Sequence, residues 1–156
     1  MDDHVLSIPL EKRPRSLIMF DLAGGGAGGR GSFMGDILER AGGRNLAAET
    51  GARWPILSPE WIMLQDPDVI ILDDYRGGDE LDQAMLIFKD QISQHPLFGK
   101  LSAIRQNHLH IIGDHLIVIP GPRAVDAVER THLILYPDIP NVSSRNTPSD
   151  PPPSSP

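Results

Sequence analysis

Short runs rich in apolar residues occur at three places in the chain, 16–22, 68–72 and 108–112. Each run is short enough to be a single strand and is bounded by turn-forming residues. Strands that are apolar on both sides are typical of parallel sheets, which are covered on both faces. The pattern therefore predicts three buried strands, with a shorter fourth strand at 45–48.

Between these runs, apolar residues recur at the three- and four-residue spacing of helices. Ser58 as a cap and Pro59 at the first helical position open one helix, which ends before Pro67. Ser32 caps another helix. The apolar faces of the remaining predicted helices are formed by Phe33, Met34, Ile37, Leu38 and Ala41, by Leu81, Ala84, Met85, Phe88 and Ile92, and by Ala124, Val128 and Leu135.

The alternation of strands and helices indicates the fold class. A strand followed by a helix and then by another strand implies a crossover between parallel strands. We therefore expect an α/β fold, with a mainly parallel sheet covered by helices on both faces. In such sheets, ligand sites gather in the loops at the carboxyl ends of the strands.

The two ends of the chain differ in composition from its middle. Seven of the fifteen prolines lie between Pro137 and Pro156, where Ile139 and Val142 are the only branched apolar residues. Such a segment cannot bury enough apolar surface to offset the entropy lost on ordering. We expect residues 141–156 to form a disordered tail rich in proline and serine. Residues 15–140 then form one α/β lobe, and residues 1–14 are weakly structured.

Charge and composition exclude several classes of protein. The chain has a formal net charge of −7 and no basic cluster, so it lacks the electrostatic footprint of a nucleic-acid binder. Without cysteine there is no disulfide, thiolate nucleophile or cysteine-bound zinc. No apolar run approaches the roughly 20 residues of a membrane-spanning helix. The acidic start of the chain does not have the pattern of an export signal.

Six glycines lie in the loop 24–31, between the first strand and the first helix. The loop satisfies the GxGxxG pattern, so a Rossmann-like nucleotide-binding enzyme domain is an alternative function. Glu49 has the spacing of the acid that such a site needs, but it lies in a turn-like sequence, and Ser32 stands where an NTPase loop needs lysine. We favour a flexible loop whose missing side chains let a ligand or another lobe approach the backbone. Gly28 and Arg30 are its candidate ligand contacts.

Two polar clusters suggest metal binding or catalysis. His108 and His110 share one face of a strand and His115 follows in the next loop, while Asp73 and Asp74 end the second strand. Spacing places no carboxylate beside the histidines, and no nucleophile, general base or oxyanion donor accompanies the acids. We therefore expect neither a metal site nor catalytic residues, and we interpret both clusters as surface or loop groups.

Four segments occur in order along the chain: Gly31-Ser32 with ILERAGGRN at 37–45, WPILSPE at 54–60, DPDVII at 66–71, and HPL at 95–97 through PGPR at 120–123. Together they resemble the carboxyl-terminal lobe of the substrate-binding proteins of ABC importers for cobalamin, haem and iron siderophores. The resemblance spans Arg13 to Pro137. It implies one lobe of a two-lobed protein that holds its ligand between lobes joined by a long rigid helix.

The resemblance also implies roles for individual residues. Trp54 matches a residue that lines the cleft and stacks on a flat macrocycle, Glu60 matches an acid that docks on a basic pocket of the membrane permease, and Asp114 matches a cleft acid of the cobalamin binders. The resemblance assigns no role to Tyr75 directly, but we expect its side chain to reach the cleft, where a phenolate suits ferric iron or haem. From the residues alone, Trp54 also fits a core or turn aromatic, and Glu60 fits a first-turn acid stabilised by the helix dipole.

The family resemblance implies binding without catalysis. The expected ligand is a metal chelate such as cobalamin, haem or a ferric siderophore, with no resident cofactor, and the expected partner is an ABC permease in a periplasmic setting. The amino-terminal lobe and the joining helix of the family have no counterpart in these 156 residues. We therefore expect half a cleft, completed by a separate amino-terminal lobe or by self-association.

Overall fold

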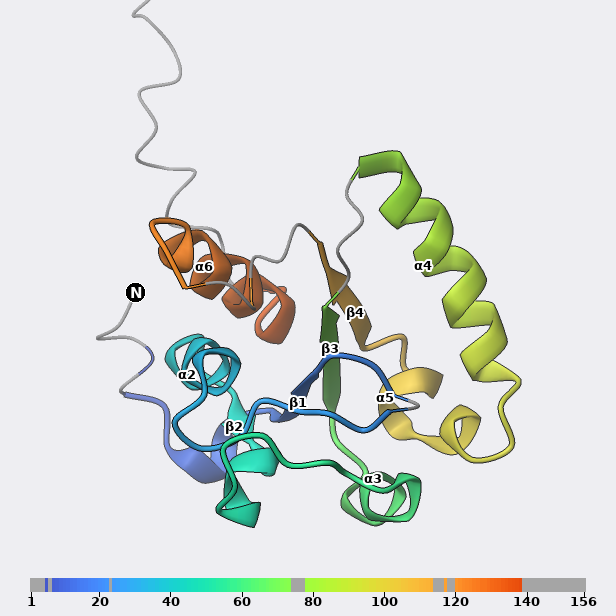
Figure 1. Ribbon diagram of the computed structural model, residues 1–156, viewed down its shortest axis with the longest axis horizontal. Coiled ribbons are helices and arrows are strands. Elements are labelled where there is room, and N and C mark those ends of the chain that lie inside the picture. Colours follow the sequence, from blue (N-terminus) through green and yellow to red (C-terminus); the bar gives the residue numbers. More distant parts are fainter. Residues whose placement is uncertain are drawn as a thin grey trace, which may run out of the picture.

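A four-stranded sheet forms the centre of the computed structural model, which describes residue 5 and residues 7–22, 24–73, 78–113, 117 and 120–138 (Figure 1). Its strand order is β2-β1-β3-β4, and every neighbouring pair is parallel. The strands are β1 (Arg15–Met19), β2 (Arg44–Asn45), β3 (Val69–Asp73) and β4 (Leu109–Ile112). The predicted parallel α/β sheet is confirmed.

Helices lie on both faces of this sheet, as the sequence predicts (Figure 1). On one face pack α2 (Phe33–Arg40) and α6 (Ala124–Leu135). On the other pack α3 (Pro59–Gln65), α4 (Gly78–Ser93), α5 (Ser102–Arg105) and the 3₁₀ turns η2 (Leu46–Thr50) and η3 (Phe98–Lys100). A further 3₁₀ turn, η1 (Leu10–Lys12), precedes β1. Within the described residues, no helix combines the length and the apolarity needed to cross a membrane.

Side chains of the central strands alternate between the two cores. Leu17 and Met19 of β1 pack with the α3, α4 and α5 layer, whereas Ile18 between them packs with α2 and α6. All three are fully buried, and β3 alternates in the same way. This is the burial of both faces that the uninterrupted apolar runs predict.

The local helix signals are also confirmed. The Ser32 hydroxyl accepts a hydrogen bond from the Gly35 amide at 2.9 Å, which caps α2. The Ser58 hydroxyl accepts one from the Trp61 amide at 3.1 Å and caps α3, with Pro59 at the first helical position. Both caps satisfy amides that have no partner within the helix.

Several boundaries differ from the prediction. β1 ends at Met19 rather than at residue 22, because the Phe20 amide donates to the Gly26 carbonyl at 2.9 Å and the chain folds back. β2 has two residues and is followed by η2, because the Asn45 side chain accepts from the Ala47 amide and turns the chain. The sequence reading did not predict η3 or α5.

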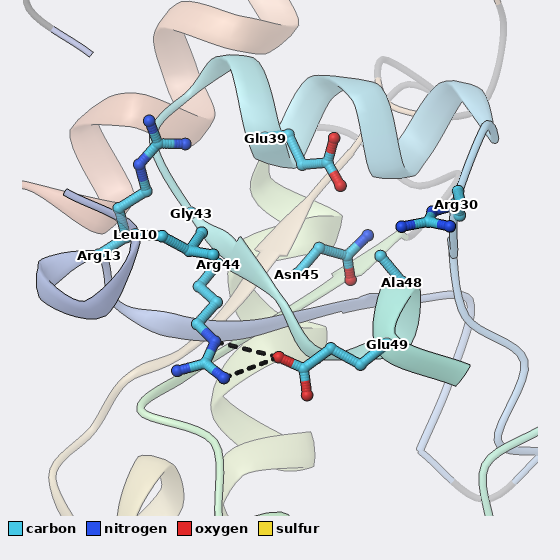
Figure 2. A pocket seen from close by; sticks show the side chains of 9 residues that line it. All are labelled: Leu10, Arg13, Arg30, Glu39, Gly43, Arg44, Asn45, Ala48 and Glu49. Carbon is cyan, nitrogen blue, oxygen red and sulfur yellow. Dashed lines mark hydrogen bonds and ion pairs between the residues drawn. The ribbon is translucent and has the colours of Figure 1, made fainter. Parts of the chain in front are cut away.

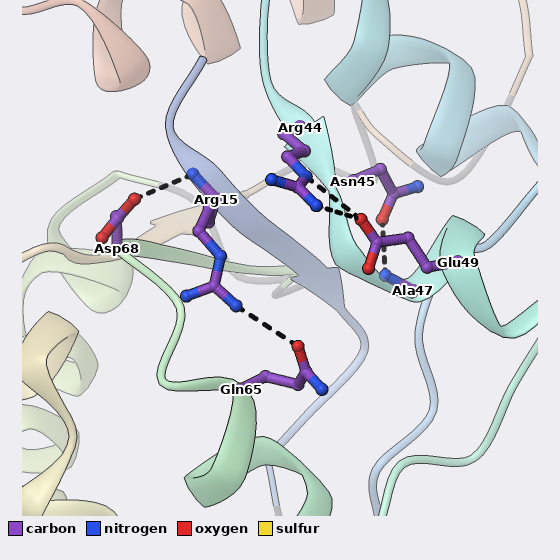
Figure 3. Close-up of polar contacts among 7 residues, drawn as sticks. All are labelled: Arg15, Arg44, Asn45, Ala47, Glu49, Gln65 and Asp68. Atoms are coloured by element: carbon purple, nitrogen blue, oxygen red, sulfur yellow. Dashed lines mark hydrogen bonds and ion pairs between the residues drawn. The ribbon is translucent and has the colours of Figure 1, made fainter. Parts of the chain in front are cut away.

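Polar contacts join the amino ends of the strands (Figure 3). The Arg15 amide donates to the Asp68 carboxylate at 2.9 Å, and the Asp68 amide donates to the Arg15 carbonyl at 2.7 Å. The Arg15 guanidinium also donates to the Gln65 side chain at 3.3 Å. These contacts fix the register of β1 against β3. All of them lie at the amino ends of the strands, opposite the carboxyl edge of the sheet.

Asp66 links the end of α3 to the start of α5. Its carboxylate accepts hydrogen bonds from the Ser102 hydroxyl at 2.6 Å and from the Ser102 amide at 2.9 Å. These bonds hold the pKa of Asp66 below its usual value against the opposing effect of burial, and Arg105 and Arg15 add to the lowering. Asp66 has a positive φ of 45°, a conformation that Asn and Asp tolerate better than most residues.

We expect Asp66→Asn to reduce the free energy of unfolding near neutral pH by roughly 1 kcal/mol, because the charged acceptor is lost while the backbone preference is kept. A lowered folded-state pKa stabilises the fold above the unfolded pKa and ceases to do so as the pH falls through the folded value. Urea unfolding of both proteins should therefore show a difference near pH 7 that shrinks as the pH falls below 3.8, the ordinary pKa of the carboxyl group. A difference that stays constant as the pH falls would contradict this explanation.

Candidate functional site

The carboxyl ends of all four strands meet at one edge of the sheet (Figure 1). Phe20 comes directly after β1, and Trp54 lies in the segment after β2 and η2. Asp73 is half-buried at the end of β3. Tyr75 and Asp114 lie outside the described residues, so their predicted ligand contacts stay untested.

The glycine loop pairs with the segment 52–57 as an irregular antiparallel ribbon. Gly26 and Ile56 form an antiparallel bridge. The hydrogen bonds of the ribbon run from the amides of Leu57, Ala27, Gly29 and Arg30 to the carbonyls of Gly25, Pro55, Arg53 and Ala52, at 2.8, 3.0, 2.9 and 3.2 Å respectively. A backbone ladder therefore joins the loop after β1 to the loop after η2.

Glycine is required in this ribbon by close packing of backbone on backbone. A Cβ atom at Gly29 would lie 2.1 Å from the Ala52 carbonyl oxygen and 2.9 Å from Cδ of Pro55. At Gly25, where φ is +73°, a Cβ atom would lie 2.2 Å from the Leu57 carbonyl oxygen. No side chain fits at either position without moving the partner strand of the ribbon.

These contacts correct the expectation of a flexible loop open to a ligand or to another lobe. The backbone that approaches the glycines belongs to the same lobe, at 52–57. The same contacts argue against the nucleotide alternative. A dinucleotide site needs free loop amides for the pyrophosphate, whereas most amides of this loop donate within the chain. The bonded amides are those of Gly24, Ala27, Gly28, Gly29, Arg30 and Ser32. Glu49, the acid with the ribose spacing, is paired with Arg44 at 2.8 Å.

The ribbon presents a group of apolar residues to solvent, which we call the apolar platform and define as Phe20, Gly26, Trp54 and Ile56. Along the extended segment, Trp54 and Ile56 are exposed and alternate with buried Pro55. Residues paired in an antiparallel bridge face the same side, so Gly26 faces the side of Ile56 and Trp54. The Phe20 ring lies over Gly26 and contacts the Trp54 ring, with ring centroids 5.8 Å apart and planes tilted by 34°.

The three side chains of the apolar platform are exposed to solvent. Phe20 is 41% exposed, Trp54 is 46% exposed and Ile56 is 82% exposed. The neighbouring Met19 and Leu57 are buried, so exposure begins where the ribbon leaves the core. A contiguous exposed apolar patch marks a surface that binds a ligand or a partner. The side chains of the platform contain no nucleophile and no group for proton transfer, so this surface is suited to binding.

Gly28 is a buried residue of the glycine loop. Its amide donates to the Ile18 carbonyl at 2.9 Å, and its carbonyl accepts from the Asn45 side chain at 2.9 Å. A Cβ atom at Gly28 would lie 2.5 Å from Cβ of Met34. These contacts account for a glycine here without any ligand, and its predicted ligand contact stays untested.

Arg30 lines a different concave surface, a cavity of about 270 Å³ between α2 and the β2 edge of the sheet (Figure 2). No residue of the apolar platform lines this cavity. Polar side chains on its floor already have partners: Arg44 donates twice to Glu49, and Asn45 bonds to Gly28 and Ala47. The Arg30 side chain therefore lines a cavity apart from the apolar platform, although its amide belongs to the ribbon, and its predicted ligand contact stays untested.

Glu60 is exposed in the first turn of α3. No ion pair joins it to another described residue, so its charge is available to a partner as well as to the helix dipole. Trp61, the next residue, points instead toward the core and packs against it. The position on an outer helix agrees with the docking role that the resemblance implies, without testing it.

The histidine cluster contributes no metal site within the described part of the chain. His108 precedes β4, and its Nδ1 lies 3.2 Å from the Asp68 carbonyl oxygen. His110 is half-buried, and burial, with the nearby Lys89 and His108, lowers its pKa. A neutral imidazole is the form that these surroundings favour. His115 lies outside the described residues.

A family model described as "Periplasmic binding protein" matches residues 7–116 of this chain. The chain belongs to the periplasmic binding protein family. Its members are substrate-binding proteins, and the solved structures it matches are two-lobed. The match covers the sheet and the ribbon that carries the apolar platform.

Three relatives show how far the similarity extends. A protein named "Cobalamin-binding protein" from Halobacterium salinarum strain R1 is 29% identical over 131 residues, 80% of this chain and 33% of that protein. An ABC transporter substrate-binding protein from Listeria monocytogenes EGD-e has a TM-score of 0.73 at 18% identity, covering 88% of this chain and 52% of that one. The ABC-type Fe³⁺-hydroxamate transport system from Saccharomonospora viridis DSM 43017 has a TM-score of 0.62 at 28% identity, covering 85% and 45%.

The chain thus spans between a third and about half of the length of these relatives. The coverage of the solved structures agrees with one lobe of a two-lobed periplasmic binding protein, the architecture expected from the sequence.

Sequence reasoning selected Trp54 but missed the other members of the apolar platform of this periplasmic binding protein. The sequence carries no signal for Ile56, because residues 54–57 are all apolar and only the structure shows that Trp54 and Ile56 are exposed. For Phe20, the signal was a large aromatic residue directly before Asp21 at the end of an apolar run. That signal does not show that the two segments meet at Gly26.

We expect Gly29→Ala to lower the free energy of unfolding by roughly 2 kcal/mol or more, because the new methyl group overlaps the Ala52 carbonyl and the ribbon must separate. Urea unfolding measures this loss. The matched control is Gly121→Ala, where a Cβ atom would have no neighbour within 4 Å. Equal stabilities for the two variants would show that the ribbon is not packed as described.

Proposed function

We propose that this chain is one ligand-binding lobe of an ABC-importer substrate-binding protein that captures a bulky metal chelate. The observation that carries the proposal is the apolar platform at the carboxyl edge of the sheet, where α/β folds bind ligands. The names of two relatives, a cobalamin-binding protein and a ferric hydroxamate transport protein, support the same class of ligand.

The chemistry of the platform favours a ligand with a broad apolar face. An indole and a phenyl ring that touch provide a large surface for stacking and dispersion contacts, and Ile56 extends it. Corrin and porphyrin rings and the apolar parts of siderophores provide complementary faces. A small oxyanion needs hydrogen-bond donors instead, and the ribbon amides of Ala27, Gly29 and Leu57 donate within the chain.

The proposed role is capture and delivery without chemical change. Delivery requires a permease, and Glu60 on the exposed side of α3 is our candidate for contact with a basic site on that partner. The second face of the ligand is to be held by the other lobe of the binding protein. This function places the protein outside the cytoplasmic membrane, in the periplasm or its equivalent.

We expect the 156-residue chain to bind cyanocobalamin, haemin or a ferric hydroxamate with a dissociation constant no tighter than roughly micromolar. One lobe supplies about half of the contact area, while the cost of immobilising the ligand is unchanged. Trp54→Ala should weaken the binding that is measured by about tenfold, because a stacked aromatic contact is lost. Isothermal titration calorimetry with the three chelates gives both numbers.

Glu60→Ala is the matched control for this measurement. Glu60 belongs to an exposed helix face outside the apolar platform, so its removal should leave the chelate affinity unchanged. Nanomolar binding by the wild-type chain, or equal losses from Trp54→Ala and Glu60→Ala, would contradict the assignment of the binding face. Absence of binding to all three chelates would overturn the proposed ligand class.

A further inference from the structure

The backbone conformation at position 26 does not require glycine. Within the described residues, the glycines with positive φ are Gly25, Gly31, Gly42 and Gly51, so Gly26 has a conformation open to other residues. A Cβ atom at Gly26 would have one near neighbour within 4 Å, the Cδ2 atom of Phe20 at 3.3 Å. The phenyl ring therefore occupies the space that a side chain at position 26 would take.

Phe20 is bound to the same residue through its backbone. Its amide donates to the Gly26 carbonyl at 2.9 Å, so the turn that ends β1 also places the ring over Gly26. From there the ring contacts Trp54. The Phe20 ring thus lies over Gly26 and contacts the Trp54 ring. A side chain at position 26 would displace the phenyl ring and change its contact with the indole.

With Phe20 as a ligand contact in the proposed function, we infer that Gly26 is a positioning residue, which sets the height and tilt of the Phe20 ring and thereby its contact with Trp54. The inference rests on the proposed function and adds to it a preference among chelates. The platform prefers chelates whose apolar face is wide enough to cover both rings, as corrin and porphyrin faces are. A methyl group at position 26 raises the phenyl ring and narrows the surface on which a flat ligand lies.

The experiment is a double-mutant cycle on the complete chain, with cyanocobalamin and haemin as probes. Phe20→Ala and Gly26→Ala should each weaken binding by roughly three- to tenfold, since an aromatic contact is removed or displaced. If Gly26 acts only through Phe20, Gly26→Ala should have no further effect in the Phe20→Ala background. An equal effect of Gly26→Ala in both backgrounds would overturn the inference.

Gly121→Ala is the control for inserting a methyl group at an open glycine, and it should leave the affinity unchanged. Urea unfolding of each variant shows whether a loss of affinity follows a loss of stability. We expect Gly26→Ala to retain nearly the stability of Gly121→Ala while losing affinity. A loss of affinity that accompanies a large loss of stability would support a merely structural role instead.

A ligand-free readout separates this inference from the proposed function. In a Trp61→Phe background, Trp54 is the sole tryptophan, and acrylamide quenching of its fluorescence reports its exposure. Gly26→Ala should increase quenching when Phe20 is present and should not when Phe20 is alanine. If this pattern holds but the wild-type chain binds no chelate, the positioning role stands and the proposed function fails. If the chain binds chelates but quenching is unchanged, the positioning role is overturned.

Discussion

The close contact between the glycine loop and the segment 52–57 is the constraint on which the candidate site depends. At Gly29 and Gly25 the two backbones approach so closely that no side chain fits between them. This approach lets the loop after β1 bond to the segment after η2 along several residues. As a result, Phe20 and Trp54, which are 34 positions apart in the sequence, meet at the carboxyl edge of the sheet.

The same contact decides which chemistry the glycine loop supports. Glycine-rich loops between a strand and a helix bind phosphates when their amides point at the ligand. Here the amides of Ala27, Gly28, Gly29, Arg30 and Ser32 donate to carbonyls of the same lobe. The surface that the ribbon presents to solvent is apolar. A surface of this kind gains binding energy from a broad apolar ligand, and its hydrogen-bonded backing holds the rings in place before the ligand arrives.

Features encoded locally were predictable from the sequence. Ser32 and Ser58 predict the starts of their helices, because a capping residue and the amides it caps are neighbours in the chain. The buried strands are predicted by runs rich in apolar residues. Features that join distant segments were not: Asp66 bonds to Ser102, 36 positions away, and Phe20 rests on a glycine paired with Ile56. Of the candidate site, Trp54 came from a family resemblance, while its partners needed the fold.

Whether the ligand lies on the apolar platform can be measured by titrating the ¹⁵N-labelled chain with cyanocobalamin and following the two tryptophan indole N–H signals by NMR. Trp54 is exposed on the platform, whereas Trp61 packs against the core. If the ligand lies on the platform, the Trp54 signal should shift saturably, while the Trp61 signal should stay nearly unchanged. Binding that leaves the Trp54 signal in place, and instead shifts the amides of Arg44 and Ala48 at the β2-edge cavity, would contradict binding on the platform.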